Sequence, residues 1–283
     1  MSGAVEHVRL AATLAGVALL AACALPPAGP PPDIVWSGEV RIAGQQVIPK
    51  GRTLVIRPGT RVLFDFVDAD RDGKGDAGLL VQGSVVAEGT PEAPIVFAPA
   101  APRPGAAWSE VRVEGGGRAL FAECRFTGAQ SAVHAHLTTL LVERCAFTRN
   151  EMGVRFRGGP VIVRGSRFRG NGTAVRYWES DPLIEGNHFA ENGTAVFCRE
   201  SSTGSVLRAN NFTSSADYHV KLGESQPGDV DARGNWWGTV DEAEIDRLIF
   251  DRADAHYLGR VIVRPFETEP LPEPGTAPTG EDD

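Results

Sequence analysis

A repeat of 21 residues constrains the fold of this chain more than any other feature of its sequence. Aromatic residues recur at this interval, and the last two intervals lengthen to 23 and 25 residues: Phe126, Phe147, Phe168, Phe189, Phe212 and Trp237. A fixed period of this size is typical of proteins in which one short structural unit stacks on the next. The repeat therefore predicts a stacked architecture from Ala119 to Phe212.

Alignment of the repeats on the aromatic position shows two further apolar columns. They stand five residues before and seven residues after it: Phe121, Val142, Val163, Ile184 and Leu207, and Val133, Val154, Val175 and Val196. Short runs of β-branched and aromatic residues favour strands, and like side chains aligned in register favour pairing between successive units. We therefore expect all three columns to face one core.

Polar residues form columns as well. Small polar side chains stand two residues before the aromatic position, and asparagines stand three after it: Cys124, Cys145, Ser166, Asn187, Asn210 and Asn235, and Asn150, Asn171 and Asn192. Stacked asparagines satisfy one another's donors and acceptors at the ~4.8 Å spacing of neighbouring strands, and asparagine tolerates the bent backbone of a corner. A fourth column alternates in charge, which predicts surface ion pairs: Glu143, Arg164, Glu185 and Arg208.

Outside the repeat block the pattern is less regular. From Ile34 onward, short β-runs alternate with turn signals such as Pro58-Gly59, without the two-residue loops of hairpins. After Trp237, residues 240–252 have helical spacing, and a strand is predicted at 260–263. The segment 240–266 would cap the open end of the stack and suppress pairing at its edge.

Three units carry the motif Gly-Asn-x-aromatic or a close variant: Gly186-Asn187-His188-Phe189, Ala209-Asn210-Asn211-Phe212 and Gly234-Asn235-Trp236-Trp237. Together with the period, these motifs resemble the repeats of bacterial right-handed parallel β-helix proteins of the pectate-lyase-like superfamily. The resemblance covers residues 34–266. It implies an all-β, single-domain right-handed parallel β-helix with a short helical C-terminal cap.

The N-terminal segment is predicted to be a targeting signal. Leu10–Leu20 has the length of a signal-peptide core, and Leu20-Ala21-Ala22-Cys23 resembles the lipobox of bacterial lipoproteins. The resemblance implies a signal peptide at 1–22, thioether lipidation and acylation of Cys23 and, because residue 24 is alanine, a lipid anchor in the outer membrane of the cell envelope. Ordinary secretory cleavage near Ala22 is the alternative. Residues 23–33 are rich in proline and would form an extended tether.

The net charge of −8 is concentrated at the C-terminus. Residues 267–283 contain six acidic residues and no Lys or Arg, and this composition predicts a disordered tail. The rest of the chain is close to neutral. A nucleic-acid partner is therefore not expected.

An aspartate-rich segment interrupts the early strands. It resembles the D-x-D-x-D-G calcium loops, in which alternate side chains converge their oxygens on one cation. The twelfth position is Leu79 instead of a bidentate Glu, so a weak structural calcium site is predicted, with a solvated acidic loop as the alternative. The predicted ligands are Asp68, Asp70, Asp72, the carbonyl of Lys74, and Asp76.

Cys124 and Cys145 lie in one column a single unit apart, so they are expected to be neighbours. A disulfide is conceivable in an oxidising periplasm, but in-register adjacent strands strain its dihedral angle, which favours stacked buried thiols. Cys198 falls in an inward column and is expected in the core.

One outward face is predicted to bind a ligand. Residues eight and ten positions after the aromatic residue alternate with the inward valines, so they should point out of one parallel sheet. Guanidinium groups bind carboxylates and sulfates bidentately, and aromatic faces stack on sugar rings. The resemblance to the lyases implies a cleft for an anionic polysaccharide here, and an ordinary basic surface is the alternative. The predicted residues are His134, His136, Arg155, Arg157, Arg176, Trp178, Phe197 and Arg199.

Three functions are compatible with this sequence: a non-catalytic envelope lipoprotein that binds a glycan or an envelope protein, a polysaccharide lyase, hydrolase or epimerase, and a purely structural envelope protein. β-Helix hydrolases need clustered aspartates, and the predicted face has no acidic residue. β-Helix lyases need Ca²⁺ beside a basic residue, and the aspartate segment lies several units away in sequence. No catalytic residue is assigned, and binding is favoured.

Overall fold

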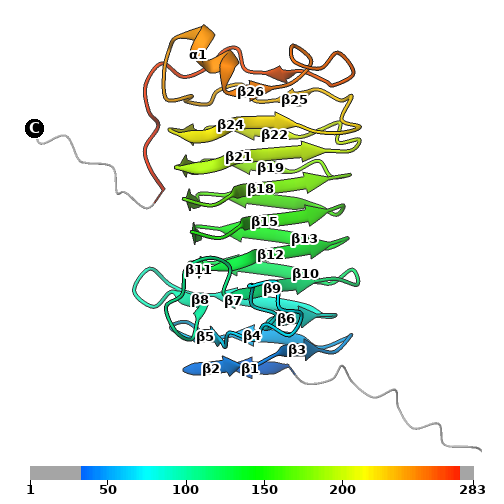
Figure 1. Ribbon diagram of the computed structural model, residues 1–283, viewed down its shortest axis with the longest axis vertical. Helices are drawn as coiled ribbons and strands as arrows, with labels where there is room; N and C mark the ends of the chain where they lie inside the picture. Colours follow the sequence, from blue (N-terminus) through cyan, green and yellow to red (C-terminus); the bar gives the residue numbers. More distant parts are fainter. Residues whose placement is uncertain (1–32, 275–283) are drawn as a thin grey trace, which may run out of the picture. The chain divides into compact units, whose positions relative to one another are not determined.

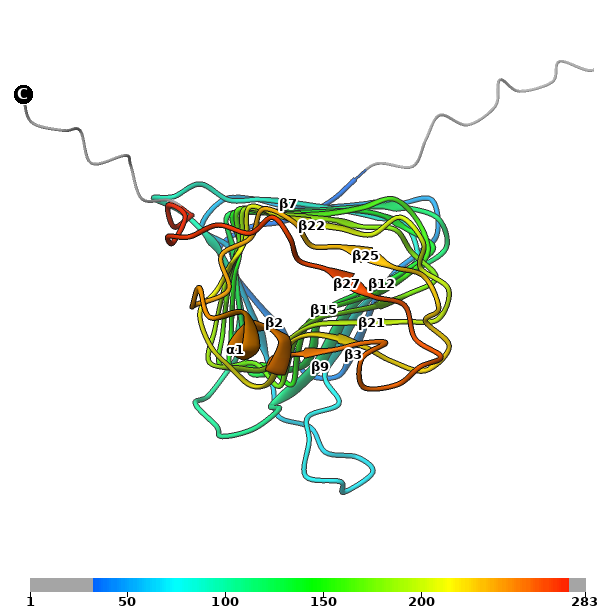
Figure 2. The same ribbon diagram turned by 90° about the horizontal axis from the view of Figure 1, so that it is seen from above.

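A computed structural model describes residues 33–274, which form a coil of short parallel strands (Figure 1). Each full turn of the coil contributes one strand to each of three sheets, and the three sheets surround a common core (Figure 2). The signal segment 1–22, Cys23 and all of the tether except Asp33 lie outside the described residues.

Strands that follow one another in a sheet come from successive turns. Sheet A has ten strands: β1 (Ile34–Trp36), β4 (Thr53–Ile56), β7 (Ser84–Glu88), β10 (Arg118–Ala122), β13 (Thr139–Glu143), β16 (Val161–Arg164), β19 (Leu183–Glu185), β22 (Val206–Arg208), β25 (Val230–Asp231) and β27 (Val261–Ile262). Sheet B has eight: β2 (Glu39–Ile42), β5 (Arg61–Phe64), β8 (Ile95–Pro99), β11 (Cys124–Thr127), β14 (Ala146–Thr148), β17 (Arg167–Arg169), β20 (His188–Ala190) and β23 (Asn211–Phe212). Sheet C has nine: β3 (Gln45–Ile48), β6 (Gly78–Val81), β9 (Trp108–Val113), β12 (Ala129–His136), β15 (Met152–Arg157), β18 (Thr173–Trp178), β21 (Asn192–Arg199), β24 (Ser215–Leu222) and β26 (Ile249–Phe250).

The aromatic period sets the register of sheet B. Phe126 pairs with Phe147, and Phe147 pairs with Phe168 on the next strand. Their rings stack with centroids 4.8 Å apart and planes 3° from parallel. The same stack begins at Phe97 and ends at Trp237, which lies 4.8 Å from the ring of Phe212. Because a period of one coil turn brings identical positions face to face, a sequence repeat becomes a continuous ring stack.

The other two apolar columns line the remaining walls of the core. The column from Phe121 to Leu207 lies on sheet A, and the column from Val133 to Val196 lies on sheet C; every member is shielded from solvent. Burial of this apolar surface is the main favourable contribution to folding. The three predicted inward columns are confirmed.

The asparagine columns form hydrogen-bonded ladders along two corners. At one corner the side-chain amide of Asn150 donates to Asn171 Oδ1 (3.0 Å), and that of Asn171 donates to Asn192 Oδ1 (2.9 Å). Each amide also donates to a carbonyl of a neighbouring turn, as Asn171 does to Phe147 (3.0 Å). The second corner repeats this arrangement with Asn187, Asn210 and Asn235.

The bent backbone at these corners belongs to the residue before the ladder position and not to asparagine itself. Residues with positive φ precede the two columns: Glu123, Arg144, Gly165, Gly186, Ala209 and Gly234, and Arg149, Gly170 and Glu191. In Gly186-Asn187-His188-Phe189, the glycine therefore takes the left-handed turn and the asparagine forms the ladder, while the phenylalanine joins the stack. This corrects the prediction that the asparagines themselves adopt the bent backbone of the corner.

The surface pairs predicted on sheet A are also present. Arg164 lies 2.9 Å from Glu143, and Arg208 lies 2.7 Å from Glu185. All four side chains are accessible to solvent, so each pair contributes little to stability.

The C-terminal cap contains the single helix of the described chain, α1 (Glu242–Arg247), at the end of the coil (Figure 1). Asp241 caps it by accepting from the N–H of Ala243 (2.9 Å). The helix is shorter than the predicted run 240–252, because Ile249–Phe250 pairs with the edge of β24 as β26. Pairing with that edge satisfies backbone groups of the last full strand of sheet C.

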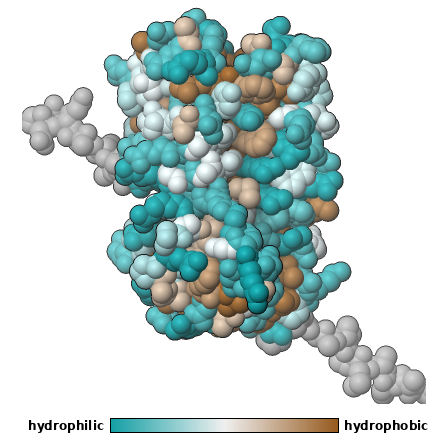
Figure 3. Space-filling model, in the orientation of Figure 1, coloured by the Kyte–Doolittle hydropathy of each residue, from teal (hydrophilic) through white to brown (hydrophobic). Residues whose placement is uncertain are grey.

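Among residues 33–274, the exposed large apolar residues lie near the two ends of the coil except Leu137, which is 69% exposed and follows β12. Val35, Val47 and Phe66 lie in the first turns, and Val240, Tyr257 and Ile262 lie in the last ones. In the view of Figure 3, hydrophilic residues cover much of the middle, and apolar patches stand nearer the ends.

Residues 267–274 have defined contacts, which corrects the prediction of a disordered tail from residue 267. The N–H of Glu267 donates to the carbonyl of Asn235 (3.0 Å), and Leu271 and Glu273 contact side chains on sheet B. The prediction failed because it was based on composition alone. In the folded chain, basic side chains of sheet B pair with the acidic Glu273, and the amide of Asn211 binds the backbone of Leu271. Residues 275–283 lie outside the described part of the chain.

Candidate functional site

All eight residues predicted for the ligand face lie together on the outer surface of sheet C, which we call the sheet C face. One register column contains His134, Arg155, Arg176 and Phe197, on β12, β15, β18 and β21. The next contains His136, Arg157, Trp178 and Arg199 on the same strands. Parallel in-register pairing places equivalent side chains about 4.8 Å apart, so the two columns run side by side.

The arginines of the second column, Arg157 and Arg199, are largely neutralised by acidic residues at the strand ends. Arg157 Nε lies 2.6 Å from Glu179, which follows β18. Arg199 contacts Glu224 at 2.7 Å and Glu200 at 3.1 Å. These two arginines therefore carry little free charge toward a ligand.

Arg155 and Arg176 differ, because neither forms an ion pair among residues 33–274; the charge of Glu110 acts on Arg155 from farther away and opposes the lowering of its pKa. Their side chains are half-buried, and the Nε atom of each is shielded from solvent without a hydrogen-bond partner. Burial lowers the pKa of Arg176, and the charges of Arg199 and Arg155 lower it further. Burial also lowers the pKa of Arg155. Two adjacent cations that are desolvated and close together favour the binding of an anion.

Aromatic rings lie beside these two arginines. The guanidinium of Arg155 lies 5.2 Å from the ring of Trp178, and that of Arg176 lies 5.3 Å from the ring of Phe197. Cation–π contacts of this kind hold a guanidinium in place without neutralising it. The charge therefore stays available to a ligand.

The sheet C face contains a carboxylate that the sequence analysis did not assign to it. Glu110 on β9 lies 2.7 Å from His134 Nδ1, and Arg112 lies 3.7 Å from Glu110. Burial opposes ionisation of Glu110, but the hydrogen bond from His134 and the nearby charges outweigh it and lower the pKa of this carboxyl. This corrects the expectation of a face without acidic residues.

Glu110 was missed because β9 lies one turn before the first aligned repeat. A register shift between β9 and β12 also prevents the repeat spacing from identifying the equivalent position on β9. Ser131 pairs with Glu110 but Val133 pairs with Val111, so one residue of β12 is extra. His134 itself is only 3% exposed, so it positions Glu110 and does not offer a ligand surface of its own. His136 lies next to it, and burial together with neighbouring cations lowers the pKa of His136.

The opposite end of the face contains an aromatic cluster around Lys221, which the sequence analysis also missed. Lys221 on β24 pairs with Phe197 in register. Its Nζ atom lies 5.4 Å from the ring of Phe197, and 5.6 Å from each of the rings of Tyr218 and Phe250. The lengthened repeats after Phe189 hide this position from a search with a fixed period.

The aspartate segment between β5 and β6 brings three of its five predicted ligands together. Carboxylate oxygens of Asp68, Asp70 and Asp76 all lie within 4.8 Å of one another. Asp72 lies outside this group, and its Oδ1 atom accepts from the N–H of Lys74 (2.8 Å). The Oδ1 atom of Asp68 is shielded from solvent and has no partner. Three hard oxygen donors with one unsatisfied atom fit a calcium ion whose remaining ligands are waters or carbonyls.

The same segment reaches farther along the coil than its place in the sequence suggests. Lys74 Nζ lies 2.7 Å from Glu151, the residue before β15, and Gln130 Nε2 donates to the carbonyl of Gly75 (2.9 Å). The strand that begins after Glu151 carries Arg155. Lys74 therefore ties the aspartate segment to the beginning of β15, and no contact joins the aspartates themselves to Arg155 among residues 33–274.

The three cysteines within residues 33–274, Cys124, Cys145 and Cys198, are buried free thiols. Cys124 and Cys145 donate to backbone carbonyls, Cys124 to Ala122 (3.3 Å) and Cys145 to Phe121 (3.4 Å). Burial raises the pKa of Cys124 well above its ordinary value and that of Cys198 to about 11. Thiols with raised pKa values are poor nucleophiles, so they are core residues.

Comparison with known families agrees with this architecture. Residues 105–236 match the family model described as "Right handed beta helix region". No curated protein and no solved structure matches the chain. The matched segment spans the aligned repeats and most of the sheet C face. Together with the three parallel sheets, it confirms the prediction of an all-β, right-handed parallel β-helix with one short helix near its C-terminal end.

Proposed function

We propose that this protein is a non-catalytic binding protein that holds an anionic polysaccharide on the sheet C face. The observation that carries the proposal is the pair Arg155 and Arg176, the adjacent cations of this face that form no ion pair among residues 33–274. Arg157 and Arg199, one column away, each contact a carboxylate within 3 Å. The two unpaired arginines are where a ligand gains most from ionic contact.

The neighbouring rings support a sugar as the carrier of the anion. Trp178 and Phe197 are both partly exposed beside the two guanidiniums. An aromatic side chain offers a flat apolar surface with limited conformational freedom, which suits the face of a sugar ring. A chain of acidic sugars would present carboxylates or sulfates to Arg155 and Arg176 while its rings contact the aromatic residues.

The carboxylate on the face does not fit the role of a general acid. The hydrogen bond from His134 and the charges of Arg112 and Arg155 favour the ionised form of Glu110. A general acid must be protonated at the working pH, and Glu110 is not poised for this role. We assign no catalytic residue.

The cellular setting remains part of the proposal. A lipid anchor on Cys23 would hold the protein in the outer membrane, with the proline-rich segment as a spacer. In the part of the chain from 33 to 274, no helix is long and apolar enough to cross a membrane.

The proposal is tested by reversing the two unpaired charges. The double variant R155E/R176E should be retained less on a column of an anionic glycan such as polygalacturonate. The salt concentration that elutes it should be at most half of that needed for the wild type. The matched control R118E/R260E makes the same change of net charge at exposed positions for which no side-chain ion pair is present. Equal retention of both double variants and the wild type would reject the sheet C face as the binding site.

One contact favours a second candidate, a calcium-dependent polysaccharide lyase. Lys74 and Glu151 tie the aspartate segment to the beginning of β15, whose Arg155 has a lowered pKa. An arginine with a lowered pKa is a better proton acceptor than an ordinary one. Incubation with polyuronates and Ca²⁺, followed by ultraviolet detection of unsaturated sugar products, separates a lyase from a binding protein.

A further inference from the structure

The outer face of sheet B carries a second set of polar side chains, unrelated to the sheet C face. A register column on consecutive strands contains Arg125, Ala146, Arg167, His188 and Asn211. The chain returns to this column after the cap, and residues 271–274 lie along it. We call residues 271–274 the strap and the column beneath it the sheet B groove.

Asn211 holds the backbone of the strap with both ends of its amide. Its Nδ2 donates to the carbonyl of Leu271 (2.7 Å), and its Oδ1 accepts from the N–H of Leu271 (2.9 Å). Asn211 is only 2% exposed, and it lies next to Asn210, which forms the ladder. A side chain that binds both the N–H and the C=O of one residue recognises an extended backbone independently of the side chain attached to it.

A carboxylate of the strap lies between two basic side chains. Glu273 is 3.2 Å from His188 Nδ1 and 3.7 Å from Arg167 Nε. Leu271 and Glu273 each stand between prolines, at 270, 272 and 274. Proline favours an extended conformation and lacks an N–H, so the segment is preorganised and leaves few donors unsatisfied.

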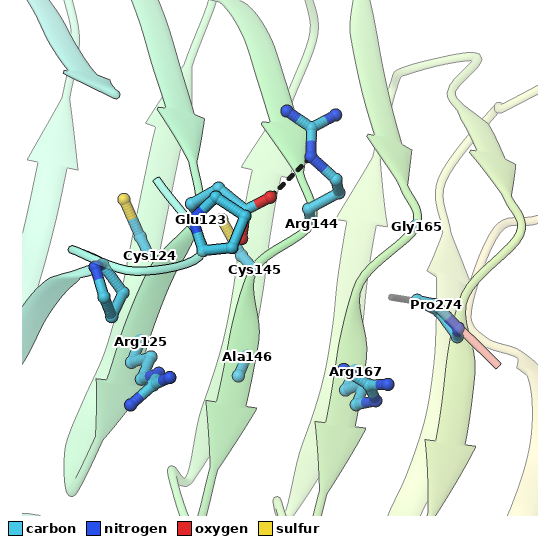
Figure 4. A pocket seen from close by; sticks show the side chains of 11 residues that line it. Glu123, Cys124, Arg125, Arg144, Cys145, Ala146, Gly165, Arg167 and Pro274 are labelled. Atoms are coloured by element: carbon cyan, nitrogen blue, oxygen red, sulfur yellow. Dashed lines mark hydrogen bonds and ion pairs between the residues drawn. The ribbon is translucent and has the colours of Figure 1, made fainter. Parts of the chain in front are cut away.

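The groove continues beyond the end of the strap. A cavity of about 410 Å³ is lined by Arg125, Ala146, Arg167 and Pro274, among others. Figure 4 shows Arg125, Ala146 and Arg167 in a row on neighbouring strands, with Pro274 beyond Arg167. The short side chain of Ala146 leaves a notch between two guanidiniums, and Arg125 has no ion pair among residues 33–274.

We propose that the sheet B groove is a binding site for an extended acidic peptide containing proline, and that the strap is a built-in occupant that such a partner displaces. The contacts select this chemistry: the backbone N–H and C=O of one extended residue for Asn211, one carboxylate for Arg167 and His188, and a second anionic group for the notch at Ala146. Because the strap is covalently attached, its effective concentration at the groove is on the order of millimolar, so a free peptide competes poorly until the strap is released.

The test measures binding of a fluorescein-labelled peptide with the sequence of residues 269–274 (EPLPEP, ends blocked) to the full-length protein by fluorescence anisotropy. The variant L271P/E273K releases the strap, because proline removes the N–H that donates to Asn211 and lysine is repelled by Arg167. It should bind the peptide at least tenfold more tightly than the wild type. The control E269K changes an exposed residue of the same segment, for which no contact is present, and should behave as the wild type.

Equal peptide affinity of L271P/E273K and the wild type would overturn the proposal. A concentration-dependent dimer of the variant without peptide binding would also overturn it, since the groove would then belong to the strap of a second copy. The full-length variant R167E provides a test that does not depend on substitutions in the strap. It should prefer, by at least tenfold, a peptide with lysine in place of Glu273 over the original peptide, and the absence of such a preference would refute the groove.

Discussion

Removal of one asparagine from a corner ladder should destabilise the coil far more than removal of a surface ion pair nearby. Asn171 is 2% exposed, and its side chain makes four hydrogen bonds. Its Oδ1 accepts from the backbone and side-chain N–H groups of Asn150, both at 3.0 Å, and its Nδ2 donates to Phe147 and Asn192.

The magnitude follows from the donors that Asn171→Ala leaves without partners. The backbone N–H of Asn150 and one N–H of its amide become buried and unsatisfied, and each costs about 1–3 kcal/mol. The small cavity left by the shorter side chain adds about 1 kcal/mol. Asn192 Oδ1 keeps the bond from the Asn171 backbone, so it adds little. The two donors and the cavity together predict a loss of about 3–7 kcal/mol of unfolding free energy.

Guanidinium denaturation followed by the fluorescence of the buried Trp108 and Trp237 measures this loss. The matched control is Arg169→Ala on the adjacent strand β17. Arg169 makes a bidentate pair with Glu191, at 2.7 and 3.0 Å, but the pair is exposed, so a much smaller loss is expected than for Asn171→Ala. Equal losses in the two variants, or a loss below about 1 kcal/mol for Asn171→Ala, would refute the argument that the ladder stabilises the corner.

Two further predictions concern protonation and calcium. Burial lowers the pKa of His219 to about 4, below its ordinary value of 6.5. Between these pH values the unfolded state therefore binds more protons than the folded state. The free energy of unfolding should fall by about 3 kcal/mol as the pH decreases from 6.5 to 4. His219→Gln should flatten this dependence and the exposed control His256→Gln should not, and identical pH profiles of unfolding would contradict the assignment. For the aspartate segment, Ca²⁺ at ten times its Kd should stabilise the protein by about 1.4 kcal/mol. Calorimetry should show heat with the wild type and the control Asp217→Asn but not with D68N/D76N, and no heat or change in Tm for the wild type would exclude the site.

The features that were predicted correctly are those that repeat. A coil turn of 21 residues places each residue opposite its equivalent on the next turn, so Phe147 necessarily meets Phe126 and Phe168. Asn171 meets Asn192 by the same rule. A contact between equivalent positions is visible in one dimension, because the spacing alone identifies both partners.

The features that were missed join unlike positions on different turns. Whether an arginine of the sheet C face is neutralised depends on glutamates at strand ends, such as Glu179, and on a residue outside the repeat, Glu110. The alignment placed Arg155 and Arg157 on one face, but it did not show that only Arg157 is paired. Such contacts depend on side-chain reach and on the path of irregular segments, which no period encodes.

The amino-acid sequence alone thus determined the coil, its inward columns and the location of its basic face, because these follow from periodic stacking. The tertiary structure decided which charges on that face are free and that the aspartate segment reaches Glu151. It also decided that an acidic segment expected to be disordered lies against Asn211 and Arg167. The physical reason is the same in each case: these outcomes depend on how far a side chain or loop extends across neighbouring turns, and only the folded coil brings those turns together.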